Sequence, residues 1–136
     1  TKLNVNINYI TDGDIAGALS VIGDKPKNDI YYSTGGGPEG VIVAAALSCY
    51  GGQIQGRLVL NQEEKIRAKK LGITDFYKKY NINDMVKGDV MFCATGVTSG
   101  DLANGVKDLG NEFEVNTFAL HKSENIIKSV KNIYNK

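Results

Sequence analysis

The stretch that decides the fold runs from residue 34 to residue 49 and reads TGGGPEGVIVAAALSC. Its second half, residues 41–49, is apolar on nearly every side, which predicts a deeply buried helix. Its first half is a glycine-rich loop, and glycines let the backbone approach a ligand closely. Pro38 suits the first helical position, where free N–H groups point outward toward phosphate or sugar oxygens. The stretch therefore predicts a buried helix whose amino end faces a ligand.

The segments around this helix predict alternating strands and helices. Residues 3–9 alternate apolar and polar side chains, as a half-buried strand does, and an acidic turn then ends the pattern. We expect further strands over residues 30–32, 53–60 and 90–94, a hairpin over residues 113–120 and 126–134, and helices over residues 15–22, 62–71 and part of 74–87. This order predicts an α/β fold, a mixed β-sheet flanked by helices, in a single domain over residues 1–136. The strands before residue 95 and the helix at residues 41–49 are expected to form its core.

Composition excludes some classes of function. Sixteen basic against fifteen acidic residues give a net charge of +1, which does not predict the basic surface that binds nucleic acid. No apolar run approaches the roughly 20 residues of a membrane span. Cys49 and Cys93 lie in apolar stretches without CxxC spacing, where cysteine acts as a small hydrophobic residue. Together with the lack of a basic, apolar leader, these features predict a cytoplasmic protein without nucleic-acid or membrane partners.

Three polar loops follow predicted strands, at Asp12–Asp14, at residues 34–40 and at residues 95–101. Ligands of open α/β sheets bind beyond the carboxyl ends of the strands, so we expect these loops to share one site. Glu39, in the first helical turn, could ligate Mg²⁺ or Mn²⁺. Each feature also has a structural explanation: the helix dipole favours Glu39, Asp14 can serve as an N-cap, and the glycine run lacks the lysine of a P-loop.

Other charged residues are expected to have structural roles. His121, the single histidine, is more typical of a surface or pairing position than of a catalytic one. Arg57 lies in an apolar strand, where pairing with a carboxylate is favoured over ligand contact. A basic cluster alternates with acids on one predicted helix, as a solvated face does, and comprises Lys65, Arg67, Lys69 and Lys70.

The combination of motifs is more specific than any one of them. In order, the motifs are ITDGDIA at residues 10–16, GGGPEG at residues 35–40 followed by AAAL at residues 44–47, GG at residues 51–52, QGRL at residues 55–58 and ATGVT at residues 94–98. In this order and spacing they closely resemble the class II fructose-1,6-bisphosphatases of the lithium-sensitive phosphatase superfamily. The resemblance covers the chain from about residue 8 to residue 120.

This resemblance implies the carboxyl-terminal half of a sugar-phosphatase fold and a metal-dependent hydrolase. Such an enzyme removes the 1-phosphate of fructose 1,6-bisphosphate to give fructose 6-phosphate in gluconeogenesis, with Mn²⁺ or Mg²⁺ as cofactor. It implies that Asp12, Gly13, Asp14 and Gly36 contact the sugar bisphosphate and that Glu39 is a metal ligand. The remaining metal carboxylates and the groups that position the attacking water would belong to an amino-terminal domain of the same protein. We therefore expect no catalytic residue in this chain, and no activity from the chain alone.

A non-catalytic module that binds a phosphosugar or a nucleotide is the alternative hypothesis. An open reading frame that extends upstream of Thr1 by about one domain, with several acidic residues, favours the enzyme. The choice of metal, the use of sedoheptulose 1,7-bisphosphate and the formation of a homo-oligomer stay open at this stage.

Overall fold

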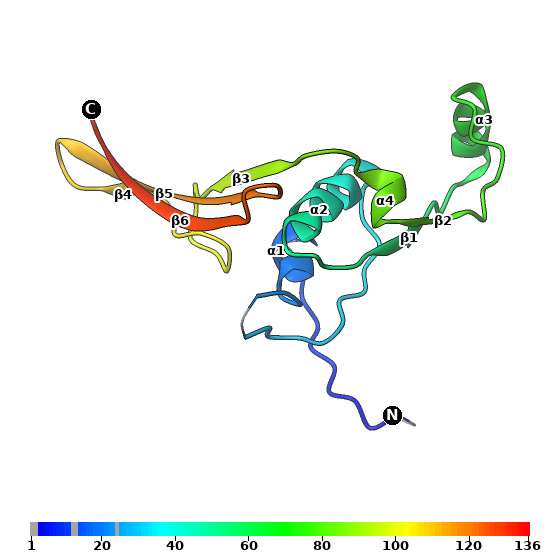
Figure 1. Cartoon of the computed structure of the whole chain (residues 1–136), viewed down its shortest axis with the longest axis horizontal. Helices are drawn as coiled ribbons and strands as arrows, with labels where there is room; N and C mark the ends of the chain where they lie inside the picture. Colours follow the sequence, from blue (N-terminus) through cyan, green and yellow to red (C-terminus); the bar gives the residue numbers. More distant parts are fainter. Residues whose placement is uncertain (1–2, 12–13, 24) are drawn as a thin grey trace.

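The computed structural model describes residues 3–11, 14–23 and 25–136 (Figure 1). Within these ranges the elements are, in chain order, α1 (Asp14–Leu19), α2 (Gly37–Cys49), β1 (Gln55–Arg57), α3 (Gln62–Lys70), β2 (Lys79–Asn81), α4 (Ile82–Met85), β3 (Met91–Thr95), β4 (Lys107–Asp108), β5 (Glu112–His121) and β6 (Ile126–Asn135). Helices and sheets together confirm the predicted α/β class.

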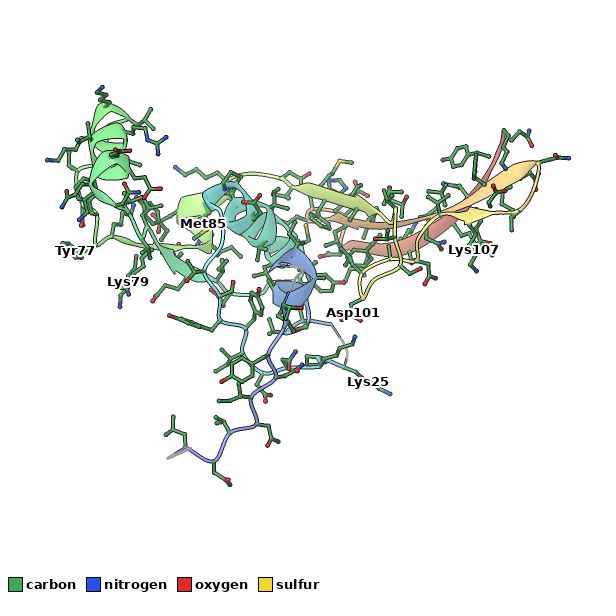
Figure 2. The ribbon with its side chains drawn as sticks, turned by 180° about the vertical axis from the view of Figure 1, so that it is seen from behind. Lys25, Tyr77, Lys79, Met85, Asp101 and Lys107 are labelled. Carbon is green, nitrogen blue, oxygen red and sulfur yellow. The ribbon has the colours of Figure 1, made fainter. Side chains whose placement is uncertain are left out.

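The described strands form two separate antiparallel sheets. β1 pairs with β2 in a short ribbon that carries α3 away from the other helices, and its base meets Met85 of α4 at Gly56. In the larger sheet, β6 pairs with the whole of β5 along one edge. β3 and β4 therefore share the other edge of β5. Figure 2 shows how far these parts extend, with Tyr77 and Lys79 on the ribbon side and Lys107 at the opposite end.

The hydrophobic core lies where α1 and α2 meet the larger sheet. Its members come from four elements and are Ala18, Leu19, Val43, Ala46, Leu47, Cys49, Phe92 and Leu120. Leu120 of β5 lies directly opposite Phe92 of β3, so the sheet presents both side chains to the helices. The burial of α2 is thus confirmed for its middle and its carboxyl end, whereas Val41 and Ile42 near its amino end are exposed.

The prediction of strands at residues 3–9 and 30–32 is wrong. Neither segment is a strand in the described structure, and their side chains lie largely in water: Leu3 is 82% exposed and Tyr32 is 91% exposed. A strand needs a neighbour to pair with its backbone groups, and none of the described segments lies alongside either stretch as a strand. The apolar side chains that alternate along residues 3–9 therefore form a face that no other described part of the chain covers.

The accessible surface area of the chain is large for its mass. The accessible surface is 10366 Å², whereas a compact protein of 14.7 kDa exposes about 6,900 Å². The chain therefore exposes roughly 3,400 Å² more than its mass requires. The exposed side chains include many large hydrophobic ones, among them residues of the amino-terminal segment, of the ribbon with α3 and of β6.

Elements that were predicted from residues close together in the sequence agree closely with the structure. α3 begins at the capping box of Asn61 and Glu64 and stops before Gly72, whose φ of +83° favours glycine. Its extent matches the predicted helix at residues 62–71 within one residue. The hairpin of β5 and β6 likewise matches the two predicted strands at residues 113–120 and 126–134.

We predict that the core residue Leu120 and the amino-terminal Leu3 differ sharply in their contribution to stability. Leu120 is 2% exposed, so Leu120→Ala should lower the free energy of unfolding by about 2–4 kcal/mol. Leu3→Ala should change it by less than about 0.5 kcal/mol, because that side chain already lies in water. Urea unfolding followed by circular dichroism measures both values, and equal losses would contradict the placement of the core.

Candidate functional site

The amino end of α2 carries the predicted metal ligand. Gly36 is the N-cap residue, with φ −68° and ψ 148°, and the backbone N–H of Gly40 donates to its carbonyl oxygen at 3.1 Å. Glu39 lies in the first turn, and its carboxylate folds back into the space that a Cβ at residue 36 would occupy. Glu39 is also exposed to solvent. The absence of a side chain at Gly36 therefore gives the Glu39 carboxylate its position over the helix end.

The predicted substrate contacts at the acidic turn are only partly described. Asp12 and Gly13 lie outside the described residues. Asp14 is the first residue of α1, where the sequence predicted an N-cap. The proposed contacts of these three residues, like that of Gly36, therefore stay predictions.

The segments that lead into the acidic turn and the glycine-rich loop meet at Gly17 of α1. A Cβ on Gly17 would lie 2.5 Å from Cδ1 of Ile10 and 2.8 Å from Cε2 of Tyr31, so only glycine allows both side chains to pack there. Ile10 lies two residues before Asp12, and Tyr31 lies three residues before the loop at residues 34–40. This contact therefore packs the residues that precede two of the three predicted site loops against one helix.

The third loop, which follows β3, folds tightly on itself. A Cβ on Gly96 would collide with the backbone of Asn104, and a Cβ on Gly105 would lie 2.7 Å from the backbone nitrogen of Ser99. The loop borders a shallow hollow of about 300 Å³. Asp101 in this loop pairs with Lys27 at 2.9 Å, which ties it to the segment that follows α1. The loop after β3 is thus tied to the segment that follows α1, whereas Ile10 and Tyr31, which precede the other two predicted loops, pack on α1 itself.

The donor chemistry at α2 fits a hard divalent cation. A carboxylate exposed on one side, as that of Glu39 is, is the ligand type that Mg²⁺ and Mn²⁺ take up beside phosphate oxygens. Within the described ranges, no group of three or more His, Cys, Asp or Glu side chains is arranged to hold a metal ion. Glu39 thus offers one ligand of suitable chemistry. In the same part of the chain, no helix has both the length and the apolar character of a membrane span.

Two expectations about single residues differ from the structure. Arg57, on β1, makes no ion pair with a carboxylate among the described residues and lies opposite Lys79 of β2. Cys93 is exposed on the outer face of the sheet, although its apolar neighbours predicted burial. Cys49 is buried as expected, and this burial raises the pKa of its thiol.

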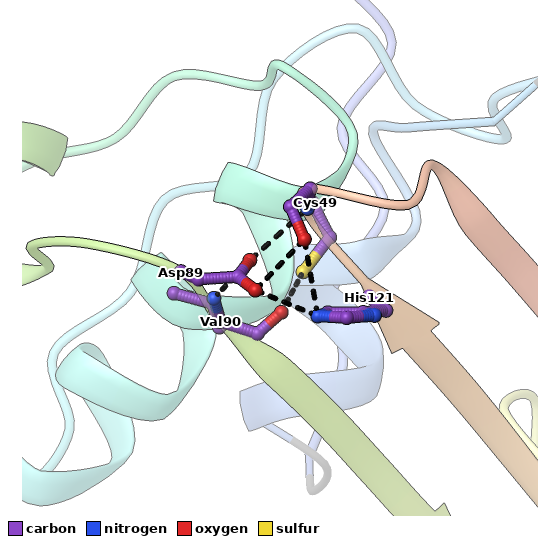
Figure 3. Close-up of polar contacts among 5 residues, drawn as sticks. Cys49, Asp89, Val90 and His121 are labelled. Atoms are coloured by element: carbon purple, nitrogen blue, oxygen red, sulfur yellow. Dashed lines mark hydrogen bonds and ion pairs between the residues drawn. The ribbon is translucent and has the colours of Figure 1, made fainter.

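His121 has the pairing role that the sequence predicted, and its partners form a cluster at one end of the larger sheet (Figure 3). Its Nε2 lies 2.8 Å from Oδ2 of Asp89, which also accepts a hydrogen bond from the Ser123 hydroxyl at 2.8 Å. The other carboxylate oxygen accepts the backbone N–H groups of Val90 at 2.9 Å and Ser123 at 3.0 Å. The hydrogen bonds from Ser123 and His121 hold the pKa of Asp89 well below its usual range.

This Ser–His–Asp cluster is not a catalytic triad. Asp89 and Ser123 both approach the same ring nitrogen of His121, and the Ser123 hydroxyl lies 3.3 Å from it. A proton relay needs the carboxylate on one ring nitrogen and the nucleophilic hydroxyl on the other. Here the Ser123 hydroxyl donates to Asp89 instead, so the cluster joins the turn after β5 to the start of β3.

Comparison with known proteins decides the family. The model of the family described as "Bacterial fructose-1,6-bisphosphatase, glpX-encoded" matches residues 1–134. This chain belongs to that family. Its relatives include "Fructose-1,6-bisphosphatase 2 class 2" of Escherichia coli (strain K12), 32% identical over 96% of this chain and 46% of the relative. Another is "D-fructose 1,6-bisphosphatase class 2/sedoheptulose 1,7-bisphosphatase" of Synechococcus sp. (strain JA-3-3Ab), 33% identical over 99% of this chain and 43% of the relative.

The chain spans less than half the length of the curated relatives that it matches. A third relative, "Fructose-1,6-bisphosphatase 1 class 2" of E. coli (strain K12), is 30% identical over 98% of this chain and 44% of its own length. These lengths agree with the resemblance to the carboxyl-terminal portion of a class II fructose-1,6-bisphosphatase.

The Asp89 cluster is the feature that analysis of the sequence missed. Asp89 precedes β3 by two residues and Ser123 follows β5 by two residues, and the two are 34 residues apart in the chain. Only the antiparallel register that places Met91 opposite His121 brings them together. The one local signal was the sequence Gly88-Asp89 before an apolar strand, which is equally typical of an ordinary turn.

We predict that Asp89→Asn lowers the free energy of unfolding at neutral pH and makes it less dependent on pH in the acid range. Because the pKa of Asp89 is lower in the folded chain than the ordinary 3.8, its ionised form stabilises the fold above about pH 4. That contribution is lost progressively as the pH falls below 3.8. Urea unfolding between pH 7 and pH 3 should therefore show a steeper loss of stability for the wild type than for Asp89→Asn.

Asp101→Asn is the matched control, because it removes an ion pair in which both side chains are largely exposed and such pairs contribute little. It should retain the pH profile of the wild type. Identical acid slopes for the wild type and Asp89→Asn would show that the cluster does not stabilise the fold.

Proposed function

We propose that this chain is the substrate-binding half of a metal-dependent fructose-1,6-bisphosphatase. The full-length protein hydrolyses the 1-phosphate of fructose 1,6-bisphosphate and releases fructose 6-phosphate, a phosphoric monoester hydrolysis. The observation that carries this proposal is the family match over residues 1–134, joined to relatives that are named for this activity. The alternative of a non-catalytic binding module has no comparable support.

The residues of this chain have distinct tasks in the proposed reaction. The carboxylates of Asp12 and Asp14 accept hydrogen bonds from sugar hydroxyls and so bind and orient the substrate. Gly36 lets the backbone approach the substrate closely. The Glu39 carboxylate serves as one ligand of a divalent cation. When bound, the cation supplies charge stabilisation to the phosphoryl oxygens.

The remaining metal ligands and the groups that position water come from an amino-terminal domain in this proposal. Two observations support such a domain. The relatives are about twice as long as this chain. The chain also exposes roughly 3,400 Å² more surface than its mass requires, including the apolar face of residues 3–9. A second domain packed on this surface would bury it and complete the site.

The proposal extends to the setting of the enzyme. We place it in the cytoplasm and in gluconeogenesis, with Mn²⁺ or Mg²⁺ as the metal. Sedoheptulose 1,7-bisphosphate belongs among the substrates to be tested, because the name of the Synechococcus relative includes it. Phosphate release from both bisphosphates by the full-length protein, with each metal in turn, is the decisive assay. No release under any of these conditions would remove the enzyme hypothesis.

We predict that Glu39→Gln abolishes most activity without unfolding the protein. A neutral amide cannot replace an anionic metal ligand, so kcat of the full-length enzyme should fall at least roughly 10²-fold. The free energy of unfolding should change by less than about 1 kcal/mol, since Glu39 is exposed. Glu63→Gln is the matched control, because Glu63 also lies in the first turn of a helix, α3.

The 136-residue chain alone should release no phosphate at millimolar Mn²⁺, since it supplies one ligand from Glu39. Metal-dependent turnover by the isolated chain that disappears in Glu39→Gln would mean that these residues contain a complete site. Near-normal activity of full-length Glu39→Gln would remove Glu39 from the metal site.

We further predict that Gly36→Ala and Gly37→Ala differ in activity although they are neighbours. An alanine Cβ at residue 36 would occupy the space of the Glu39 carboxylate, whereas a Cβ at residue 37 meets nothing within 4 Å. The φ and ψ of Gly36 are open to alanine, so both variants should fold. The apparent Mn²⁺ affinity and kcat of the full-length enzyme should fall for Gly36→Ala and stay near wild type for Gly37→Ala. Equal effects would show that the position of Glu39 does not depend on Gly36.

A further inference from the structure

α1 follows the acidic turn at residues 12–14 and precedes the glycine-rich loop at residues 34–40 in the chain. Two of its residues, Ala18 and Leu19, belong to the hydrophobic core. They share one cluster with Leu47 of α2, against which α1 packs (Figure 1). α2 carries Glu39 in its first turn. The position of α1 is therefore fixed relative to the helix that offers the proposed metal ligand.

Hydrogen bonds fasten the segment that follows α1 back onto the helix. The carbonyl oxygen of Ser20 accepts the backbone N–H groups of Lys27 at 2.9 Å and Asn28 at 3.2 Å. The Ser20 hydroxyl donates to the carbonyl oxygen of Gly17 at 2.6 Å and accepts the side-chain amide of Asn28 at 2.8 Å. The segment therefore begins its path toward the glycine-rich loop from a defined point beside α1.

Gly17 is the residue of α1 at which Ile10 and Tyr31 both pack. Carbon atoms in favourable contact lie about 3.5–4.0 Å apart. A Cβ on Gly17 would lie 2.5 Å from Cδ1 of Ile10 and 2.8 Å from Cε2 of Tyr31. A side chain at residue 17 would therefore displace the first atom by about 1 Å and the second by about 0.7 Å.

These contacts form a closed ring around the glycine-rich loop. Tyr31 packs on α1, and the chain runs from there through residues 34–36 into α2. α2 packs on α1 through the core. Because both ends of the loop are held against the same helix, the distance that the loop spans is fixed. In the same way, Ile10 fixes the point from which the chain enters the acidic turn.

We infer that Gly17 is a positioning residue of the enzyme, and that its lack of a side chain sets the distance between the acidic turn and the glycine-rich loop. The inference rests on the proposed function, in which Asp12 and Asp14 bind sugar hydroxyls and Glu39 binds the metal. One substrate molecule must reach both groups at once. An error of about 1 Å in such a placement can cost roughly 10²-fold in rate. A side chain at residue 17 therefore acts on the reaction without touching the substrate.

Gly17→Ala in the full-length enzyme tests the inference. Alanine favours a helix more than glycine does, so α1 itself is not weakened. The value of kcat/KM for fructose 1,6-bisphosphate should fall roughly 10- to 100-fold, mainly through a higher KM. Calorimetric titration should show weaker binding of the bisphosphate to the metal-free protein and weaker binding of Mn²⁺, because Ile10 leads to the acidic turn and Tyr31 to the loop before Glu39.

Gly56→Ala is the matched control. It makes the same change at a glycine of β1, where a Cβ would meet only the flexible end of Met85, at 3.2 Å. Its kinetics and both binding affinities should stay near those of the wild type. Circular dichroism should give the wild-type spectrum for both glycine variants, which separates a displaced site from an unfolded protein.

Changes at Ile10 test the contact from its other side. Valine lacks Cδ1, the atom nearest to the new Cβ, so Gly17→Ala/Ile10→Val should recover most of the lost affinity for the bisphosphate. The affinity for Mn²⁺ should stay low in this double variant, because Cε2 of Tyr31 is still displaced. Ile10→Ala removes the contact without any collision. It should fold, since Ile10 is 49% exposed, and should raise KM about three- to tenfold.

Three results would overturn the inference. The first is a Gly17→Ala enzyme with the KM and the binding affinities of the wild type. The second is an Ile10→Ala enzyme with the wild-type KM, which decides the question if Gly17→Ala does not fold. The third is a double variant that recovers no affinity for the bisphosphate. A wild-type enzyme that releases no phosphate would instead remove the proposed function, and the positioning role of Gly17 with it.

Discussion

The packing of α2 against β3 and β5 is the contact on which the rest of the structure depends. Ala44 and Ala46 of α2 have no exposed surface, so this helix approaches its neighbours closely, and Leu47 packs in the same cluster as Phe92 and Leu120. The same helix connects the two chemically distinct ends of the molecule. Its amino end, about 20 Å from its carboxyl end, carries Glu39, and Cys49 at its carboxyl end contacts Val90, the residue after Asp89. Substitutions that loosen this core are therefore expected to disturb both ends.

The sequence predicted those features that depend on residues near one another in the chain. Asn61 and Glu64 form a capping box three residues apart, which is why the limits of α3 were predictable. The hairpin at residues 112–135 was predictable for the same reason, since its two strands are joined by four residues. The α2 helix and the place of Glu39 in its first turn follow from Pro38 and the apolar run behind it.

Features that depend on distant or additional partners could not be predicted from the pattern alone. The alternation at residues 3–9 indicates a strand with one apolar face, but this chain supplies no described strand beside it. Cys93 shares its apolar neighbours with a buried strand, yet it points to the open face because helices cover only the other side. The Asp89 cluster forms only because β3 pairs with β5 in the register that places Met91 opposite His121. The ligand residues Asp12, Gly13, Asp14 and Gly36 came from resemblance to a family, since an acidic turn and a glycine loop are common without any ligand.

The incomplete surfaces of this chain are of two physical kinds, which require different partners. The segment at residues 3–9 exposes side chains on an apolar face, and any well-packed apolar surface can cover it, so a domain that differs in sequence suffices. The edge of β6 exposes backbone N–H and C=O groups, which only another extended backbone can satisfy along its length.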